Sequence, residues 1–395
     1  MTITREENER LTRYGPGTPC GELFRRYWWP VGVITELTSV APTKHVRLLG
    51  EDLVLWKDKS GNVGLIQDHC AHRGASLLYG RVEERGIACA YHGWLYDTKG
   101  NCLECPAEPA GSMFHLTVKA TAYPVEAYLG LYWAYLGPAP APLLPECGLD
   151  PAWGVVAVEE ETGMRCNWLQ IVENAADGLH FPILHQEFTA GRWPNPPPLV
   201  STTRGYIDQY AGNDYWEEPW GIMRKASYKI ETLADMTVGD SDAIIFPHIR
   251  RHRHEVIIKV PADDVTTTKW RVYPTTEPEP DRPIEHWINQ NPIEVVKGPN
   301  GRYRMDSVNF QDLTVMESQG PISERENWRL ATSDRGIAML HEMLFREMEK
   351  VAQGLDPINV CRGSGEDVVA PVMWEPNGRI PHKGLKVYPA EPVLS

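Results

Sequence analysis

Apolar residues in the first third of the chain fall in short runs that alternate with turn residues. Two such runs between His45 and Gln67 meet at Ser60-Gly61-Asn62, which is typical of a turn between paired strands. A further group of apolar and aromatic residues, "YPVEAYLGLYWAYLG", occupies Tyr123–Gly137. The pattern predicts a hairpin over residues 45–67, more strands over 123–137, and a first part that is mostly β.

The spacing of apolar residues changes after the Pro- and Gly-rich stretch Leu136–Gly154, which resembles a linker and divides the chain in two. Residues 167–186 have helical spacing, whereas residues 243–274 are typical of strands. A last helix is predicted from about Ser333 to Gly354, because an apolar stripe follows one face. The stripe consists of Ile337, Leu340, Leu344, Met348 and Val351. The second part is therefore expected to be α+β, with helices packed on one antiparallel sheet.

Acidic residues outnumber basic ones, 53 to 39, and give the 395-residue chain a formal net charge of -14. This balance favours solubility and argues against a nucleic-acid partner.

The N-terminus is polar and charged, and no apolar run is long enough to span a bilayer, so we expect a cytoplasmic protein without a membrane partner. Eight cysteines without a secretory signal are too few and too scattered for a disulfide scaffold. They indicate reduced thiols or metal ligands.

Four potential metal ligands lie in two short segments, Cys70-x-His72 and Cys89-x2-His92. A Cys2His2 zinc site normally pairs cysteine with cysteine and histidine with histidine, whereas each segment here contains one of each. In a Rieske [2Fe–2S] centre two cysteines hold one iron and two histidines hold the other. Two loops that each supply one ligand to each iron fit this arrangement, so a Rieske centre is favoured over zinc.

Nearby residues add detail to this interpretation. Gly74 and Gly93 allow the backbone to pass close to a cluster and to direct N–H groups at its sulfurs. Cys102 and Cys105 form another Cys-x2-Cys pair, but no histidine pair accompanies them. We therefore interpret these two cysteines as core or surface thiols.

A second set of polar residues lies in "ENAADGLHFPILH". In a helix Glu173, Asp177 and His180 would share one face, because their spacing is i, i+4, i+7. Pro182 is expected to kink or end the helix near Phe181 and so to turn His185 toward His180. Two histidines and one carboxylate are the ligands of a non-haem Fe(II) oxygenase site. Spacing alone leaves the carboxylate open, and the candidates are Asp312, Glu317 and Asp334.

The Cys/His spacing followed by "GW" resembles the Rieske loops of ring-hydroxylating non-haem iron oxygenases. Two further segments resemble the large (alpha) subunits of the phthalate-dioxygenase and O-demethylase branch of this family. They are "ENERLTRYGPGTPCGELFRRYWWPVG" and "MESQGPISERENW". The resemblance covers nearly the whole chain. It implies an N-terminal segment, residues 1–40, packed on the catalytic domain, a small all-β Rieske domain, residues 41–145, and a catalytic mononuclear-iron domain of helix-grip type, residues 146–395.

The resemblance also assigns roles to residues. Asn174, Asp177, His180 and His185 match the family pattern Asn-x2-Asp-x2-His-x4-His. It implies that His180 and His185 bind Fe(II), and that Asp177 bridges one of them to the Rieske ligand His92 of a neighbouring subunit. The family's carboxylate ligand comes from a segment similar to "NFQDLTVMESQGP", which favours Asp312. Asp334 is then expected to be a charge near the start of the last helix.

The implied function is that of a terminal oxygenase with a [2Fe–2S] cluster and a mononuclear Fe(II). The chain contains no Gly-rich dinucleotide motif and no plant-type ferredoxin motif, so a separate NAD(P)H-dependent reductase, with or without a ferredoxin, is expected as partner. A homotrimer or hexamer is implied.

The expected reaction uses O2 to hydroxylate or O-demethylate an aromatic substrate, and Arg204, Arg250 and Arg251 are candidate anchors for a substrate carboxylate. Alternatives are a Rieske electron carrier with a partner-docking domain, and an N-dealkylating or non-aromatic monooxygenase.

Overall fold

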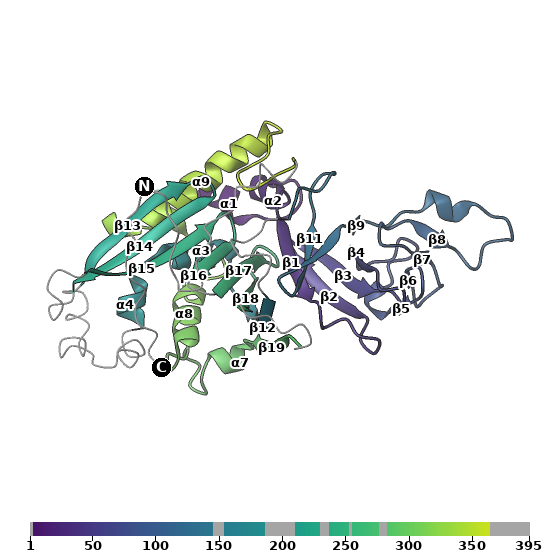
Figure 1. Ribbon diagram of the computed structural model, residues 1–395, viewed down its shortest axis with the longest axis horizontal. Helices are drawn as coiled ribbons and strands as arrows, with labels where there is room; N and C mark the ends of the chain where they lie inside the picture. The colour runs from purple at the N-terminus through teal and green to yellow at the C-terminus, as the bar shows by residue number, and fades with distance from the viewer. Residues whose placement is uncertain are drawn as a thin grey trace.

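The computed structural model describes residues 3–144, 154–185, 210–229, 237–252, 255–275 and 283–363 (Figure 1). A large sheet with helices lies at one end of the molecule, and an arm of small sheets extends from it. Among the described residues, no helix is both long and apolar enough to cross a membrane.

The N-terminal segment forms two short helices, α1 (Arg5–Thr12) and α2 (Pro19–Phe24). Thr4 and Glu7 form a capping box at the start of α1, because each side chain accepts a hydrogen bond from the other's backbone N–H. The two helices lie against α9 (Arg335–Ala352) (Figure 1). The N-terminus is thereby joined to the C-terminal half of the chain.

Three small antiparallel sheets make up the arm. One has the strand order β1-β11-β10, the second β2-β3-β4-β9, and the third β5-β6-β7-β8. The strands are β1 (Trp28–Val33), β2 (Thr43–Leu48), β3 (Glu51–Lys57), β4 (Val63–Gln67), β5 (Arg81–Val82), β6 (Ile87–Ala88), β7 (Leu95–Tyr96), β8 (Cys102–Glu104), β9 (Ala122–Tyr123), β10 (Val125–Tyr128) and β11 (Leu131–Tyr135). The predicted hairpin is confirmed, because β3 pairs with β4 and the Asp58 carboxylate accepts the Asn62 N–H at 2.7 Å in the turn.

The second half contains an eight-stranded sheet with the order β13-β14-β15-β16-β17-β18-β12-β19. Its strands are β12 (Gly154–Met164), β13 (Tyr210–Glu218), β14 (Gly221–Lys229), β15 (Thr237–Ile245), β16 (Ile249–His252), β17 (Glu255–Pro261), β18 (Thr267–Thr275) and β19 (Glu285–Gln290). All neighbours are antiparallel except β12 and β19. Since β19 reverses the direction of β18 but lies beyond β12, it runs parallel to β12. The sheet is therefore mixed at this edge and not fully antiparallel as predicted.

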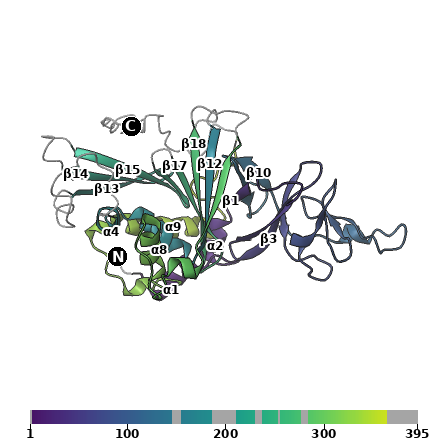
Figure 2. The ribbon, with the colours of Figure 1, turned by 90° about the horizontal axis from the view of Figure 1, so that it is seen from below.

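Helices cover one face of this sheet, which confirms the α+β prediction (Figure 2). They are α3 (Trp168–Ala176), α4 (His180–Leu184), α7 (Ile293–Val296), α8 (Val308–Glu317) and α9. Single 3-10 turns occur at Leu77–Tyr79, Phe114–Thr117, Arg325–Asn327 and Thr332–Asp334. The predicted last helix is confirmed as α9, whose apolar stripe is buried and which ends before Gly354 at a positive φ of 77°.

Candidate metal centres

The two loops with the predicted cluster ligands have the same backbone geometry. In the first, the Cys70 N–H donates to the Ala75 carbonyl and the Gly74 N–H donates back to the Cys70 carbonyl, both at 2.9 Å. In the second, the Cys89 N–H donates to the Trp94 carbonyl and the Gly93 N–H donates back to the Cys89 carbonyl, again at 2.9 Å. The two glycines have φ of 70° and 74°, a conformation that strains other residues. The glycines are thus required by the turn that presents each ligand.

The four side chains divide into a buried thiol pair and an outer imidazole pair. Cys70 and Cys89 are 3% and 2% exposed, whereas the rings of His72 and His92 lie toward the surface with centroids 4.6 Å apart. His72 stacks on Trp94 at 4.4 Å. This arrangement fits a cluster with one iron between two thiolates inside and one iron between two imidazoles outside.

The local environment also fits this group. Burial raises the pKa of the Cys89 thiol, and the neighbouring Cys70 raises it further, so bound metal is needed to hold Cys89 as a thiolate. Partial burial and the charges of His72 and Arg73 lower the pKa of His92, which favours the neutral ligand form. The Tyr96 hydroxyl lies 3.3 Å from the Cys70 sulfur, within hydrogen-bond distance.

Cys102 and Cys105 lie behind these loops, with their sulfurs 3.6 Å apart. Cys102 is buried in the same apolar cluster as Cys70 and Cys89. Burial raises the pKa of Cys102 to about 12, so it is a protonated core thiol at neutral pH.

The helix that carries the second set of residues breaks earlier than predicted. Helix α3 ends at Ala176, and α4 begins at His180 and continues through Pro182. The expectation of a break near Phe181 is wrong, because a proline in the first turn replaces an N–H that has no partner within the helix. The break occurs at Asp177-Gly178, where a side chain on Gly178 would overlap Asn213 of β13.

The break brings three predicted ligands together. The Nε2 atom of His185 lies 3.1 Å from an oxygen of Asp312, and the Nε2 atom of His180 lies 3.9 Å from the same oxygen. One ligand atom from each side chain lies within 4.8 Å of the other two. Ligands bound at about 2 Å to one ion are separated by about 3 Å, so the donor set fits a mononuclear metal with little adjustment.

Each histidine is oriented through its second ring nitrogen. The His180 Nδ1 atom lies 3.4 Å from the Asp177 carboxylate, and the His185 Nδ1 atom lies 2.8 Å from the Gln311 amide oxygen. The Asn174 amide donates to Asp312 at 3.4 Å. Gln311 was missed in the sequence, although its position directly before Asp312 was a usable signal.

Charges at this site favour an ionised carboxylate. Burial opposes ionisation of Asp312, but the hydrogen bond from His185 and the nearby charge of His180 hold its pKa below the usual range. For Asp177, burial is likewise outweighed by the neighbouring His180 ring and by the hydrogen bond from the Leu179 N–H, and its pKa is lowered. Both carboxylates are therefore anionic at neutral pH, as a metal site and its supporting contacts require.

The other carboxylates considered from the sequence lie elsewhere. Glu317 is buried and pairs with Arg165 at 2.9 Å, and Asp334 lies at the start of α9. Glu173 points into the core, where it pairs with Arg325 and His341, both at 2.6 Å. The expectation that Glu173 shares one helical face with His180 is wrong, because these residues belong to separate helices.

The predicted carboxylate anchors are not brought together. Arg204 lies outside the described residues. Arg250 lies on the sheet face turned to the iron triad and pairs with Asp242 at 2.8 Å, whereas strand alternation places the buried Arg251 on the opposite face. Arg224, which was missed in the sequence, donates to the Asp177 carbonyl at 3.4 Å.

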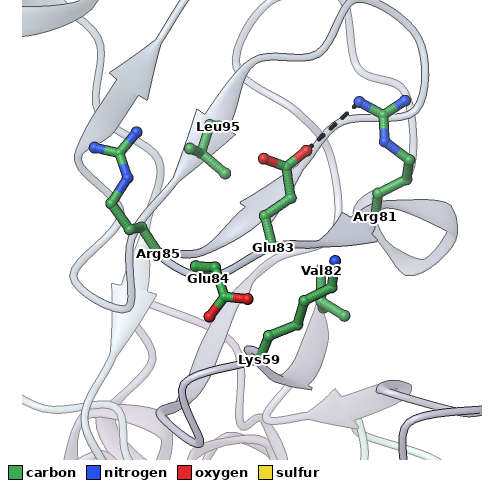
Figure 3. Close-up of a pocket in the computed structure, with 7 residues that line it drawn as sticks. All are labelled: Lys59, Arg81, Val82, Glu83, Glu84, Arg85 and Leu95. Carbon is green, nitrogen blue, oxygen red and sulfur yellow. Dashed lines mark ion pairs between the residues drawn. The ribbon is translucent and has the colours of Figure 1, made fainter.

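Two other features of the described residues are a second group of possible metal ligands and a surface hollow. Glu36, Glu160 and His286 could together hold a metal, but the Lys44 ammonium already lies 2.9 Å from Glu36 and 3.0 Å from Glu160. A surface hollow of about 400 Å³ is lined by residues 81–85, Lys59 and Leu95, and Arg81 pairs with Glu83 there (Figure 3). None of its lining residues is a predicted metal ligand.

Comparison with known proteins agrees with this geometry. The Rieske [2Fe-2S] domain family matches residues 27–124. The chain is 38% identical over 378 residues to the 5,5'-dehydrodivanillate O-demethylase oxygenase subunit of Sphingobium sp. (strain NBRC 103272 / SYK-6), covering 91% of this chain and 84% of that protein. It is 33% identical to the tert-butanol monooxygenase / tert-amyl alcohol desaturase oxygenase subunit of Aquincola tertiaricarbonis, with 92% and 81% covered. It is 30% identical to the phthalate 4,5-dioxygenase oxygenase subunit of Pseudomonas putida, with 93% and 90% covered.

A solved structure has the same fold. It is the Pseudomonas putida CBB5 NdmA QL mutant with theobromine, with a TM-score of 0.58 and 22% identity, covering 88% of this chain and 99% of the other. The chain therefore belongs to the Rieske non-haem iron oxygenases, with a [2Fe–2S] cluster and a mononuclear iron as cofactors. Within this family its full-length relatives are oxygenase subunits, and it is likewise the terminal oxygenase component.

Proposed function

We propose that this oxygenase acts on an aromatic carboxylate, by removing the methyl group of an aryl methyl ether or by hydroxylating the ring. The observation that carries the proposal is the convergence of His180, His185 and Asp312 opposite a sheet face that carries Arg224 and Arg250. Relatives named for dehydrodivanillate and phthalate, both aromatic acids, support this substrate class.

In the proposed site Cys70, Cys89, His72 and His92 hold the cluster, and His180, His185 and Asp312 hold the mononuclear iron. When bound, the cluster supplies single electrons and the Fe(II) supplies open positions at which O2 is activated. Gln311 accepts from the outer ring nitrogen of His185, and the Asp177 carboxylate lies 3.4 Å from that of His180, so both contacts hold the imidazoles in place. Asn174 holds the Asp312 carboxylate by a hydrogen bond.

Electrons come from a separate NAD(P)H-dependent reductase, with or without a ferredoxin. For O-demethylation, the aryl methyl ether, O2, NAD(P)H and one proton give the phenol, formaldehyde, NAD(P)+ and water. For monohydroxylation, one oxygen atom enters the ring and the other leaves as water. A cis-dihydrodiol retains both atoms.

The cluster and the iron triad of one chain lie far apart, since the arm with β6 and β7 and the helices α4 and α8 occupy opposite parts of the molecule (Figure 1). A homotrimer, alone or stacked as a hexamer, would place the half-buried His92 of one subunit against Asp177 of the next. Asp177 would then accept a hydrogen bond from a ligand imidazole of each centre and couple the two.

A non-aromatic substrate is the second candidate, favoured by the relative named for tert-butanol. Purified protein, a surrogate reductase and NADH should be incubated with methoxylated and unsubstituted aromatic acids and with tert-butanol. We expect formaldehyde, dihydrodiol or hydroxylated product from an aromatic acid. Turnover of tert-butanol alone would contradict the proposed substrate class.

A further inference from the structure

Lys259 of β17 is a buried lysine whose ammonium group is not used by the fold. The residue is 5% exposed, and no carboxylate of the described residues forms an ion pair or hydrogen bond with its side chain. Burial and the like charges of Arg250 and Lys269 lower its pKa well below the usual value. A cation in this position destabilises the folded protein unless a counter-charge pairs with it.

Strand register places Lys259 on the helix-covered face. Tyr215 pairs with Arg224, Arg224 with Asp242, and Arg250 with Ile257, two residues before Lys259. Arg250 and Asp242 share one face, because Arg250 pairs with Ile244, two residues after Asp242. All of these side chains, including Lys259, therefore lie on one face of the sheet.

The same face meets the break that positions the iron triad. The Tyr215 hydroxyl accepts the Gly178 N–H at 3.1 Å, and Arg224 donates to the Asp177 carbonyl at 3.4 Å. Lys259 also lies within electrostatic range of Asp312, the only carboxylate among the leading influences on its pKa. Asp312 itself is committed to His185.

The neighbouring charges on this face form ion pairs, whereas Lys259 does not. Arg224 and Arg250 both pair with Asp242, Lys269 pairs with Glu161, and Arg271 pairs with Glu159. Among the described residues Lys259 has no ion pair. A lysine in this position favours an incoming anion over a neutral group.

We propose that Lys259 binds the carboxylate of the substrate and so selects acids over their neutral analogues. This inference rests on the proposed function, and it names a lysine of β17 in place of the arginines predicted from the sequence. This role accounts for a buried lysine at a position where an apolar side chain would be more stable.

The test compares 4-methoxybenzoate with 4-methoxybenzamide, which have similar shape but differ in charge. Binding to the iron-loaded, oxidised protein is measured by titration calorimetry. The wild-type protein should bind the acid at least about tenfold more tightly than the amide. In Lys259→Met affinity for the acid should fall by at least about tenfold, with amide affinity unchanged, whereas Lys259→Arg should retain the preference.

Lys225→Met, on the opposite face of β14, serves as the matched control and should bind both compounds as the wild type does. The melting temperature of Lys259→Met should equal or exceed that of the wild type, since a buried amine without a partner is replaced by an apolar side chain. Lack of a preference in the wild type, or equal weakening of both compounds with a lower melting temperature, would overturn the assignment.

Turnover separates this inference from the proposed function. Acid binding that depends on Lys259, without any oxygenated or demethylated product, would support the anion site and contradict the proposed function. Normal turnover of the acid by Lys259→Met with unchanged affinity would support the proposed function and contradict the anion site.

Discussion

Single residues decide how the mononuclear iron would be held. His180 and His185 offer Nε2 atoms to the same oxygen of Asp312, while Asp177, Gln311 and Asn174 hold the outer sides of these groups. Gln311 and Asn174 form hydrogen bonds, and the Asp177 carboxylate lies 3.4 Å from the His180 ring. Contacts of this kind fix ring orientation and raise ligand basicity. The site is thus built to hold a divalent metal before substrate arrives.

Replacement of Asp312 by alanine should remove the mononuclear iron. Two histidines alone bind Fe(II) weakly, because the only anionic ligand is lost. Metal analysis should fall from about three to about two iron per chain, with the visible spectrum of the cluster unchanged. Retention of the third iron would contradict Asp312 as a ligand and indicate that another carboxylate binds the metal.

Replacement of Gln311 by methionine should weaken iron binding without removing a ligand. His185 would lose the acceptor at 2.8 Å that fixes its ring, and such contacts change metal affinity by about 10- to 100-fold. Competition with a chelator measures this affinity. Gln319→Met, the same change at an exposed position near the end of α8, should have no effect.

Residue spacing grouped residues that the structure brings together. The alternation of cysteine and histidine predicted Cys70, His72, Cys89 and His92 as one group of ligands, and the proximity of His180 and His185 in sequence indicated a second site. Asp312 could not be chosen by spacing, because it follows more than a hundred residues later and two other acids were available. Lys259 gave no signal, since its role depends on burial beside strands that are distant in sequence.

At the scale of elements, the break between α3 and α4 separates Glu173 from His180, which the residue spacing predicted on one helix. Helix α3 directs Glu173 into the core, and α4 directs His180 toward the metal site. The sequence pattern could not show this, because Pro182 is compatible with the first turn of a helix and Asp177-Gly178 carries only a weak break signal. Contact with β13 decides the position of the break.

Replacement of Glu173 by glutamine should destabilise the catalytic domain. Arg325 and His341 would lose their buried anion, and breaking a buried pair costs about 3 kcal/mol or more. Thermal unfolding measures the loss at pH 7. Glu324→Gln, an exposed carboxylate next to Arg325, should stay within about 0.5 kcal/mol of the wild type.

The same variant has a defined pH dependence. Burial opposes ionisation of Glu173, but Arg325 and His341 hold its pKa below the usual value. The folded state therefore binds fewer protons, so the carboxylate stabilises the protein above the unfolded pKa of about 4.3. The difference between wild type and Glu173→Gln should be constant from pH 7 to about 5 and shrink as the pH falls through 4. A difference that grows on acidification would contradict this assignment.

At the scale of the whole molecule, strands β6 and β7 of the arm, which adjoin the cluster loops, lie far from helices α4 and α8, which carry the iron triad (Figure 1). His92 lies near the surface beside Tyr91, which is 57% exposed and has its ring centroid 3.8 Å from that of His92. The fold of one chain therefore presents a cluster that is ready to contact a second molecule. The sequence indicated both centres, but their separation depends on how the arm and the large sheet are joined.

We expect the purified protein to be a trimer. Three chains of 44.6 kDa have a mass of about 134 kDa, and a hexamer has twice this mass. Light scattering coupled to gel filtration determines the mass directly. A monomer that retains full activity would contradict a site that depends on the neighbouring subunit.

Single-turnover oxidation of Asp177→Asn tests the coupling of the two centres most directly. Both metals should remain bound, because Asp177 is not proposed as a ligand, but asparagine supplies no anion between the two imidazoles. The protein is reduced, freed of reductant and mixed with O2 and an aromatic acid, and cluster absorbance is followed. We predict rapid oxidation with product in the wild type and a cluster that stays reduced in the variant. Oxidation of the variant at the wild-type rate would contradict the role proposed for Asp177.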